Sequence, residues 1–170
     1  RHVRLLGGTG LVRSGLLVYQ ELMVERGGEF FDRFSGNSIY ENEWDVLIIL
    51  DGCRVDLLRE VADQYSFVSR VNRVDSVAGH SAGWMDATFD DTYSDKMADT
   101  AYITANPHSR EHLSEEDFAV LDEVWQYMWD NDVGTVPPRA VTDRAIALNR
   151  DDVADRYLIH YMQPHFPSIP

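Results

Sequence analysis

The chain of 170 residues has one cysteine, one lysine and no long apolar run. A single cysteine excludes an intrachain disulfide, and its place behind an apolar run favours a small buried residue, Cys53, over a catalytic thiol. Charged and polar residues interrupt the most apolar long stretch, residues 11–24, which falls short of the roughly 20 residues that cross a bilayer. We therefore expect no membrane partner for this segment. Because the sequence starts at Arg1 instead of Met, we expect that native N-terminal residues precede it.

Positive charge is also scarce, since 15 basic residues face 29 acidic ones and the formal net charge is −14. Such a surface repels nucleic acid, which is therefore not an expected partner. An anionic substrate would need a local positive centre, such as a bound metal ion. Abundant Asp with Lys96 as the lone lysine favours adaptation to the salty cytoplasm of a halophilic archaeon, where salt screens self-repulsion. The alternative is an ordinary acidic protein.

Apolar patterning predicts that strands and helices alternate along the chain. We predict strands over residues 44–50, 67–74, 100–105 and 157–162. We predict helices over residues 11–26, 54–64, 84–89, 114–128 and 137–148. This alternation predicts an α/β fold, a three-layer α/β/α sandwich with a mixed, mostly parallel sheet, over residues 36–170. Residues 1–35 are predicted to form an N-terminal helical extension.

Polar residues lie at the ends of three of the predicted strands: Asp51, Asn106 and the stretch 160–165. Ligands of open α/β sheets bind beyond the carboxyl ends of strands, so chemistry is expected there. Asp51 is well placed to bind a divalent cation, but Asp before a helix is also a favoured N-cap. Asn106 is either a donor to an oxyanion or a turn residue that ends its strand before proline.

The string WDVLIILDGCR, residues 44–54, resembles the first strand of the alkaline phosphatase/sulfatase superfamily. The variant LD-x-x-R-x-D, here residues 50–56, is similar to sulfatase-like hydrolases of haloarchaea. The resemblance implies that Asp51 binds a divalent metal ion, which could be Zn, Mn, Ca or Mg. Sulfatases usually carry two adjacent Asp residues at this place. Gly52 replaces the second, which argues against a full sulfatase-type calcium site.

Two further stretches carry the same resemblance. Residues 76–85 match the segment that bears the family's nucleophile, which implies that Ser81 is the nucleophile; the alternative is a helix N-cap. The Pro-Ser/Ala-Arg pattern required for a formylglycine is absent. Residues 157–167 resemble an H-x-P-H-x-P element, which implies that His165 contacts the transferred group or the leaving oxygen. His160 is expected to pack inside its strand. His108 and His112 have zinc-like spacing, but polar neighbours favour a solvated face.

Together these features predict a metal-dependent hydrolase or transferase acting on phosphate or sulfate esters, with Asn106 and His165 binding the substrate. The family's remaining metal ligands, an Asp-His pair, are expected after Pro170, so the chain is expected to be the N-terminal part of a longer protein. A phosphatase with an Asp nucleophile fits less well, because Cys53 stands where that chemistry needs a second Asp. The other alternative is a non-catalytic acidic α/β domain that binds a partner.

Overall fold

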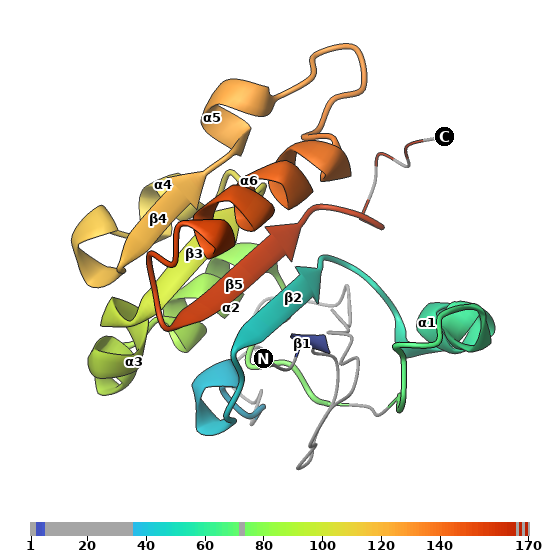
Figure 1. Cartoon of the computed structure of the whole chain (residues 1–170), viewed down its shortest axis with the longest axis horizontal. Coiled ribbons are helices and arrows are strands. Elements are labelled where there is room, and N and C mark those ends of the chain that lie inside the picture. The colour runs from blue at the N-terminus through green and yellow to red at the C-terminus, as the bar shows by residue number, and fades with distance from the viewer. Residues whose placement is uncertain (1–2, 6–35, 72–73, 166, 168, 170) are drawn as a thin grey trace, which may run out of the picture.

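The computed structural model describes residues 3–5, 36–71, 74–165, 167 and 169 (Figure 1). Its strands are β1 (Val3–Leu5), β2 (Val46–Leu50), β3 (Thr100–Thr104), β4 (Val120–Glu123) and β5 (Arg156–Tyr161). They form one sheet in the order β1-β2-β5-β3-β4. The predicted α/β fold is therefore confirmed. The sheet was expected to be mixed, but every strand pair among the described residues is parallel.

Six α-helices connect the described strands. They are α1 (Val55–Val61), α2 (Ser81–Thr88), α3 (Ser94–Ala98), α4 (Ser109–His112), α5 (Trp125–Met128) and α6 (Pro138–Arg150). Single turns of 3-10 helix lie at Ile39–Glu41, Ala62–Gln64, Asp91–Tyr93 and Glu115–Asp117. The longest helix, α6, opens with proline, whose missing N–H has no partner to lose in a first turn. None of the helices in the described ranges is long and apolar enough to cross a membrane.

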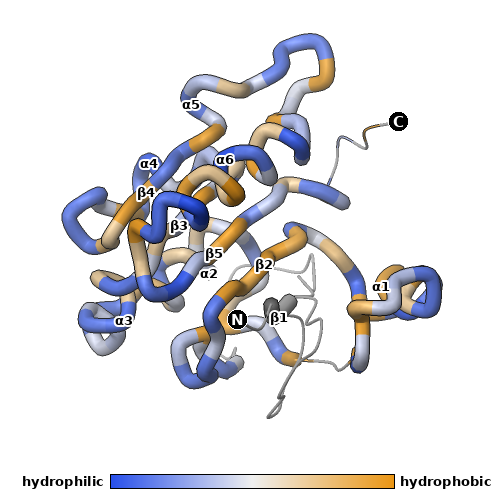
Figure 2. The backbone as a smooth tube through the Cα atoms, viewed as in Figure 1, coloured by the Kyte–Doolittle hydropathy of each residue, from blue (hydrophilic) through white to orange (hydrophobic). Residues whose placement is uncertain are grey.

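Helices pack on both faces of the sheet because side chains alternate along each strand. On one face, residues of the central strands pack with Trp84 and Met85 of α2 and with Met97 of α3. The strand residues on this face are Leu47, Ile49, Tyr102 and Leu158. On the other, strand residues pack against α6; these are Ala101, Ile103, Tyr157 and Ile159. Figure 1 shows α6 lying across β5 and β3, and Figure 2 shows the apolar residues gathered on the central strands. Each large apolar side chain buried in this way stabilises the fold by roughly 1.5–3 kcal/mol.

The last described strand, β5, lies between β2 and β3 and joins them. Asp51 N–H donates to the Tyr161 carbonyl at 3.0 Å, and Ala105 N–H donates to the His160 carbonyl at 3.0 Å. The backbone pairing thus continues just past the strands. As a result, the carboxyl ends of β2, β5 and β3 lie side by side, and the residues that follow them share one edge of the sheet.

Two predicted elements were wrong. Among residues 67–71 and 74, where a strand was predicted, none forms one: Phe67 is 70% exposed, and Val68 and Val71 pack beside α1 against Cys53 and Leu58. The other is the helix over residues 114–128. Ser114 does accept an N–H bond, from Glu116, but the helix stops after one turn, and β4 pairs with the free edge of β3 instead. Tertiary pairing overrides local helical spacing there. The predicted helix over residues 11–26 lies outside the described residues.

Candidate functional site

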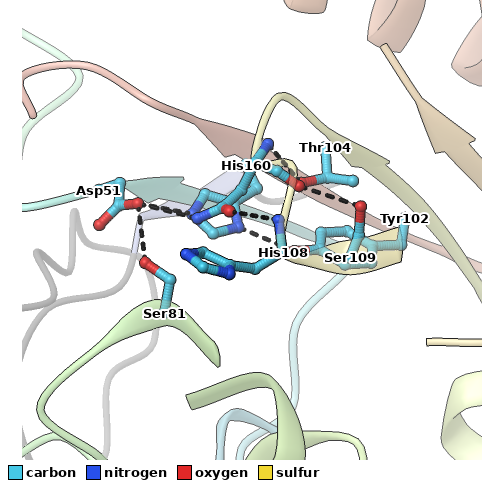
Figure 3. A network of polar contacts seen from close by, with 8 residues as sticks. Asp51, Ser81, Tyr102, Thr104, His108, Ser109 and His160 are labelled. Atoms are coloured by element: carbon cyan, nitrogen blue, oxygen red, sulfur yellow. Dashed lines mark hydrogen bonds and ion pairs between the residues drawn. The ribbon is translucent and has the colours of Figure 1, made fainter. Parts of the chain in front are cut away.

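Three polar residues from distant parts of the chain converge at the carboxyl edge of the sheet. Asp51, which is only 8% exposed, is at their centre. The Ser81 hydroxyl donates to Asp51 Oδ2 at 3.2 Å, and the Asn106 amide donates to the same oxygen at 3.1 Å. Figure 3 shows Ser81 below the carboxylate, at the start of α2. The sheet and α2 therefore bring together three of the residues that the sequence singled out.

The turn after β2 gives Asp51 its position. Gly52 has φ +66°, a left-handed conformation that favours glycine. Cys53 N–H then closes the turn on the Leu50 carbonyl at 3.1 Å. A Cβ on Gly52 would lie 3.3 Å from Cδ2 of His165, so a larger residue would also crowd that imidazole. Glycine at position 52 therefore has a local structural reason.

Ser81 is the first residue of α2, and its hydroxyl does not cap the helix. The cap is His80, whose Nδ1 accepts from Gly83 N–H at 3.0 Å. The interpretation of Ser81 as the N-cap was therefore wrong, because the neighbouring imidazole fills that role. The Ser81 hydroxyl is directed to Asp51 instead, at the positive end of an eight-residue helix.

Asn106 ends its strand as a turn residue, one of the two alternatives that the sequence left open, and its side chain also holds Asp51. Its Oδ1 accepts from His108 N–H at 3.0 Å, which shapes the turn after β3. Its Nδ2 meanwhile donates to Asp51, and the side chain is buried at 1% exposure. One fully buried amide therefore ends the strand and fixes the carboxylate.

His160, near the end of β5, is 2% exposed and packs inside the protein as expected. Its Nδ1 lies 2.8 Å from the Tyr102 hydroxyl. Its Nε2 is buried, has no hydrogen-bond partner among the described residues, and faces Asp51 Oδ2 at 3.7 Å. The sequence did not reveal this proximity. The one available signal was a histidine near the end of an otherwise apolar strand.

Electrostatics favour the ionised form of Asp51. Burial alone raises the pKa of this carboxyl group. The imidazoles of His160 and His165 and the hydrogen bond from Ser81 together outweigh burial, so the pKa of Asp51 lies below its usual value. The centre of the site is therefore an anionic oxygen pair shielded from water.

His165 lies beside this centre, at the surface. Its backbone N–H donates to the Asp51 carbonyl at 3.0 Å, and its imidazole rests against Gly52. The side chain is exposed, as suits a residue at the rim of a site. Because it is tied to Asp51 through the backbone, its position follows the turn after β2.

The other reactive residues of the described chain are placed differently. His112 pairs with Asp86 of α2 at 2.6 Å, and its ring centroid lies 6.3 Å from that of His108. Burial raises the pKa of Cys53 to about 11, with Asp56 adding to the effect, so the thiol stays neutral at physiological pH. Within the described ranges, no group of three or more His, Cys, Asp or Glu side chains could hold a metal ion.

Comparisons of the chain with protein-family models, with curated proteins and with solved structures gave no match.

Proposed function

We propose that this protein is a metal-dependent hydrolase or transferase of the alkaline phosphatase/sulfatase type, acting on phosphate or sulfate esters through Ser81. The observation that carries the proposal is the Ser81 hydroxyl at a helix N-terminus, hydrogen-bonded to a buried, ionised Asp51. A developing oxyanion is favoured at that place by the helix dipole. The carboxyl edge of a parallel sheet is also where ligands of such folds bind.

Asp51 and Ser81 supply two of the oxygen donors that a divalent cation needs. Asp51 offers a buried carboxylate held by Asn106, and Ser81 offers a hydroxyl oxygen at 3.2 Å from it. Hard and borderline ions such as Mg, Mn, Ca and Zn take such oxygens as ligands. Asp51 and Ser81 would hold the ion, which would lower the pKa of the hydroxyl and polarise the ester.

The chain's own residues have separate roles in the proposed reaction. Ser81 Oγ attacks the phosphorus or sulfur atom in line and forms a covalent ester as the bond to the leaving oxygen breaks. The hydroxyl proton passes to solvent water, and water returns a proton to the leaving oxygen, so the group departs as an alcohol. The low pKa of Asp51 makes it a weak base, so it orients the hydroxyl and does not store its proton. His165 at the rim stabilises charge on the transferred group or the leaving oxygen. Water or an acceptor alcohol then breaks the covalent ester and frees Ser81.

Turnover of nitrophenyl phosphate, bis-nitrophenyl phosphate and nitrophenyl sulfate with Zn, Mn, Ca or Mg tests the proposal. Ser81→Ala and Asp51→Asn should each lower kcat/KM by about 1000-fold or more, since each removes part of one catalytic unit. Ser94→Ala is the matched control, because Ser94 is exposed and also begins a helix, α3. Full activity in both site variants would sink the proposal.

A second candidate is a non-catalytic acidic domain that binds a partner protein. It is favoured by three consecutive exposed apolar side chains at α5, namely Tyr127, Met128 and Trp129. Elemental analysis discriminates the two candidates. Purified protein without divalent metal, and without a metal-induced rise in Tm, would support partner binding over catalysis.

We further infer that the protein works in the salty cytoplasm of a halophilic archaeon. The support is compositional: a net charge of −14 with a single lysine. Salt screens the repulsion within such a surface, so Tm should rise steadily with KCl well beyond physiological concentrations. A Tm that does not change between dilute and concentrated KCl would contradict this inference.

A further inference from the structure

We infer that His160 is a second ligand of the metal ion, bound through Nε2 opposite Asp51. The inference rests on the proposed function and deepens it, because neither the strand pattern nor the family resemblance gave His160 a role in the site. It starts from a buried ring nitrogen that has no hydrogen-bond partner among the described residues and faces a carboxylate (Figure 3).

The distance between the two atoms suits a shared ion. His160 Nε2 and Asp51 Oδ2 are 3.7 Å apart, which is too far for an N–H···O hydrogen bond. Zinc binds imidazole nitrogen and carboxylate oxygen at about 2.0–2.2 Å, so both atoms can reach one ion. Ser81 Oγ, 3.2 Å from the same Oδ2, lies within similar reach. His160 Nε2 and Ser81 Oγ thus both approach the same oxygen of Asp51.

Tyr102 provides the support that a ligating histidine needs. Its hydroxyl lies 2.8 Å from His160 Nδ1. The tautomer of His160 with its proton on Nδ1 donates that proton to the Tyr102 oxygen. In that tautomer Nε2 carries the ring's lone pair, which lies 3.7 Å from Asp51 Oδ2 and is compatible with the ionised carboxylate when a cation lies between the two atoms. Ligating histidines usually donate their other ring N–H to a neighbouring acceptor in this way.

Packing fixes the orientation of the His160 ring before any ion binds. Tyr102 stacks on it with ring centroids 6.2 Å apart, and Trp84 packs edge-on at 5.7 Å. A leucine or phenylalanine at this position would fill the same core without burying an unpaired nitrogen. The histidine therefore carries a desolvation cost in the metal-free chain that coordination would remove.

Calorimetric titration of zinc into the metal-free full chain tests the inference by affinity, without reference to turnover. His160→Gln and Asp51→Asn should each weaken zinc binding by about 100-fold or more, and Tyr102→Phe by about 10-fold, since it removes the supporting hydroxyl. His112→Gln is the matched control, because it removes an imidazole that pairs with Asp86 and not with Asp51. It should bind zinc within threefold of the unaltered chain, roughly the scatter of such effects.

A second measurement does not depend on whether His160→Gln folds. Zinc X-ray absorption should show imidazole scattering in a variant whose exposed imidazoles near the site, His80, His108 and His165, are all replaced by Gln. Loss of that scattering would overturn the inference, as would a folded His160→Gln variant that binds zinc normally. If zinc binding still requires Asp51 in either case, the proposed function stands. No zinc binding by the unaltered chain would overturn both.

Discussion

Two aspartates in this sheet are equally buried, at 8% exposure each, but have different surroundings. Asp122 of β4 meets a permanent cation: Arg144 of α6 places Nε and Nη2 at 2.7 and 2.6 Å from Oδ2. The Tyr127 hydroxyl donates to Oδ1 at 2.6 Å. Asp51 instead meets a neutral hydroxyl, a neutral amide and imidazoles.

Under the proposed function, the difference separates a structural carboxylate, Asp122, from one that binds a cation, Asp51. A buried charge is tolerated when a partner neutralises it, and Arg144 does so for Asp122. No arginine or lysine pairs with Asp51 among the described residues, so the carboxylate keeps its capacity to bind a cation. Four measurements test this contrast, from the largest expected effect to the smallest.

The largest effect is expected at the structural carboxylate. Asp122→Ala should lower the free energy of unfolding by about 3 kcal/mol, because it leaves Arg144 and Tyr127 without their partner. The estimate is at the low end for a buried pair, since the Arg144 side chain is 42% exposed. Urea unfolding gives the value. A loss below about 1 kcal/mol would show that the pair is worth no more than a surface ion pair.

Zinc should stabilise the fold through Asp51, and this effect should not depend on Asp122. With zinc at about 100 times its Kd, the free energy of unfolding should rise by about 2.7 kcal/mol. Asp51→Asn should abolish this gain. Asp122→Asn should keep it on its weaker background, as thermal scans with and without zinc would reveal. If zinc stabilises neither variant, the prediction that only Asp51 binds the ion is wrong.

In metal-free protein, Asp51→Asn should cost about 1 kcal/mol or less. The substituted amide still offers an oxygen to Ser81 and Asn106, so only the charge-assisted part of each bond is lost. The matched change Asp122→Asn should cost clearly more under the same conditions. If urea titrations show equal losses of unfolding free energy for the two variants, the assignment of a structural role to Asp122 alone is wrong.

The smallest effect concerns acid. Because the pKa of Asp51 is lower in the folded state than its usual value near 4, its ionised form stabilises the fold above that pH. This contribution disappears as pH falls from about 4 through the folded-state pKa. The stability gap between the unaltered chain and Asp51→Asn should therefore narrow by tenths of a kcal/mol between pH 6 and pH 3. If this stability gap widens instead, the pKa of Asp51 is raised in the folded state and not lowered.

Much of the fold could be predicted from the sequence because the central strands have a clear local pattern of apolar residues. The runs that became β2, β3 and β5 are apolar on both faces, a pattern typical of buried parallel strands. β4 was not readable. Its short segment lies inside a longer stretch with helical spacing, and only the free edge of β3 makes it a strand. Pairing between distant segments is invisible to local periodicity.

The site was readable in part for the same reason. Asp51 and Asn106 follow recognisable strands, so their convergence followed from sheet geometry. The Nε2 of His160 could not be placed beside Asp51 without the strand register, which sets Ile49 opposite His160. The cap formed by His80 was also missed, since histidine is an uncommon cap residue.

The position of β5 in the sheet has a consequence for synthesis on the ribosome. β2 and β3 leave the ribosome well before β5, yet neither pairs with the other directly. In the nascent chain, β2 and β3 therefore have no common neighbour until residues 156–161 emerge and pair with both of them. Only that last insertion brings Asp51 and Asn106 together. The edge of the sheet that carries Asp51 and Asn106 is thus assembled only after residues 156–161 have been translated.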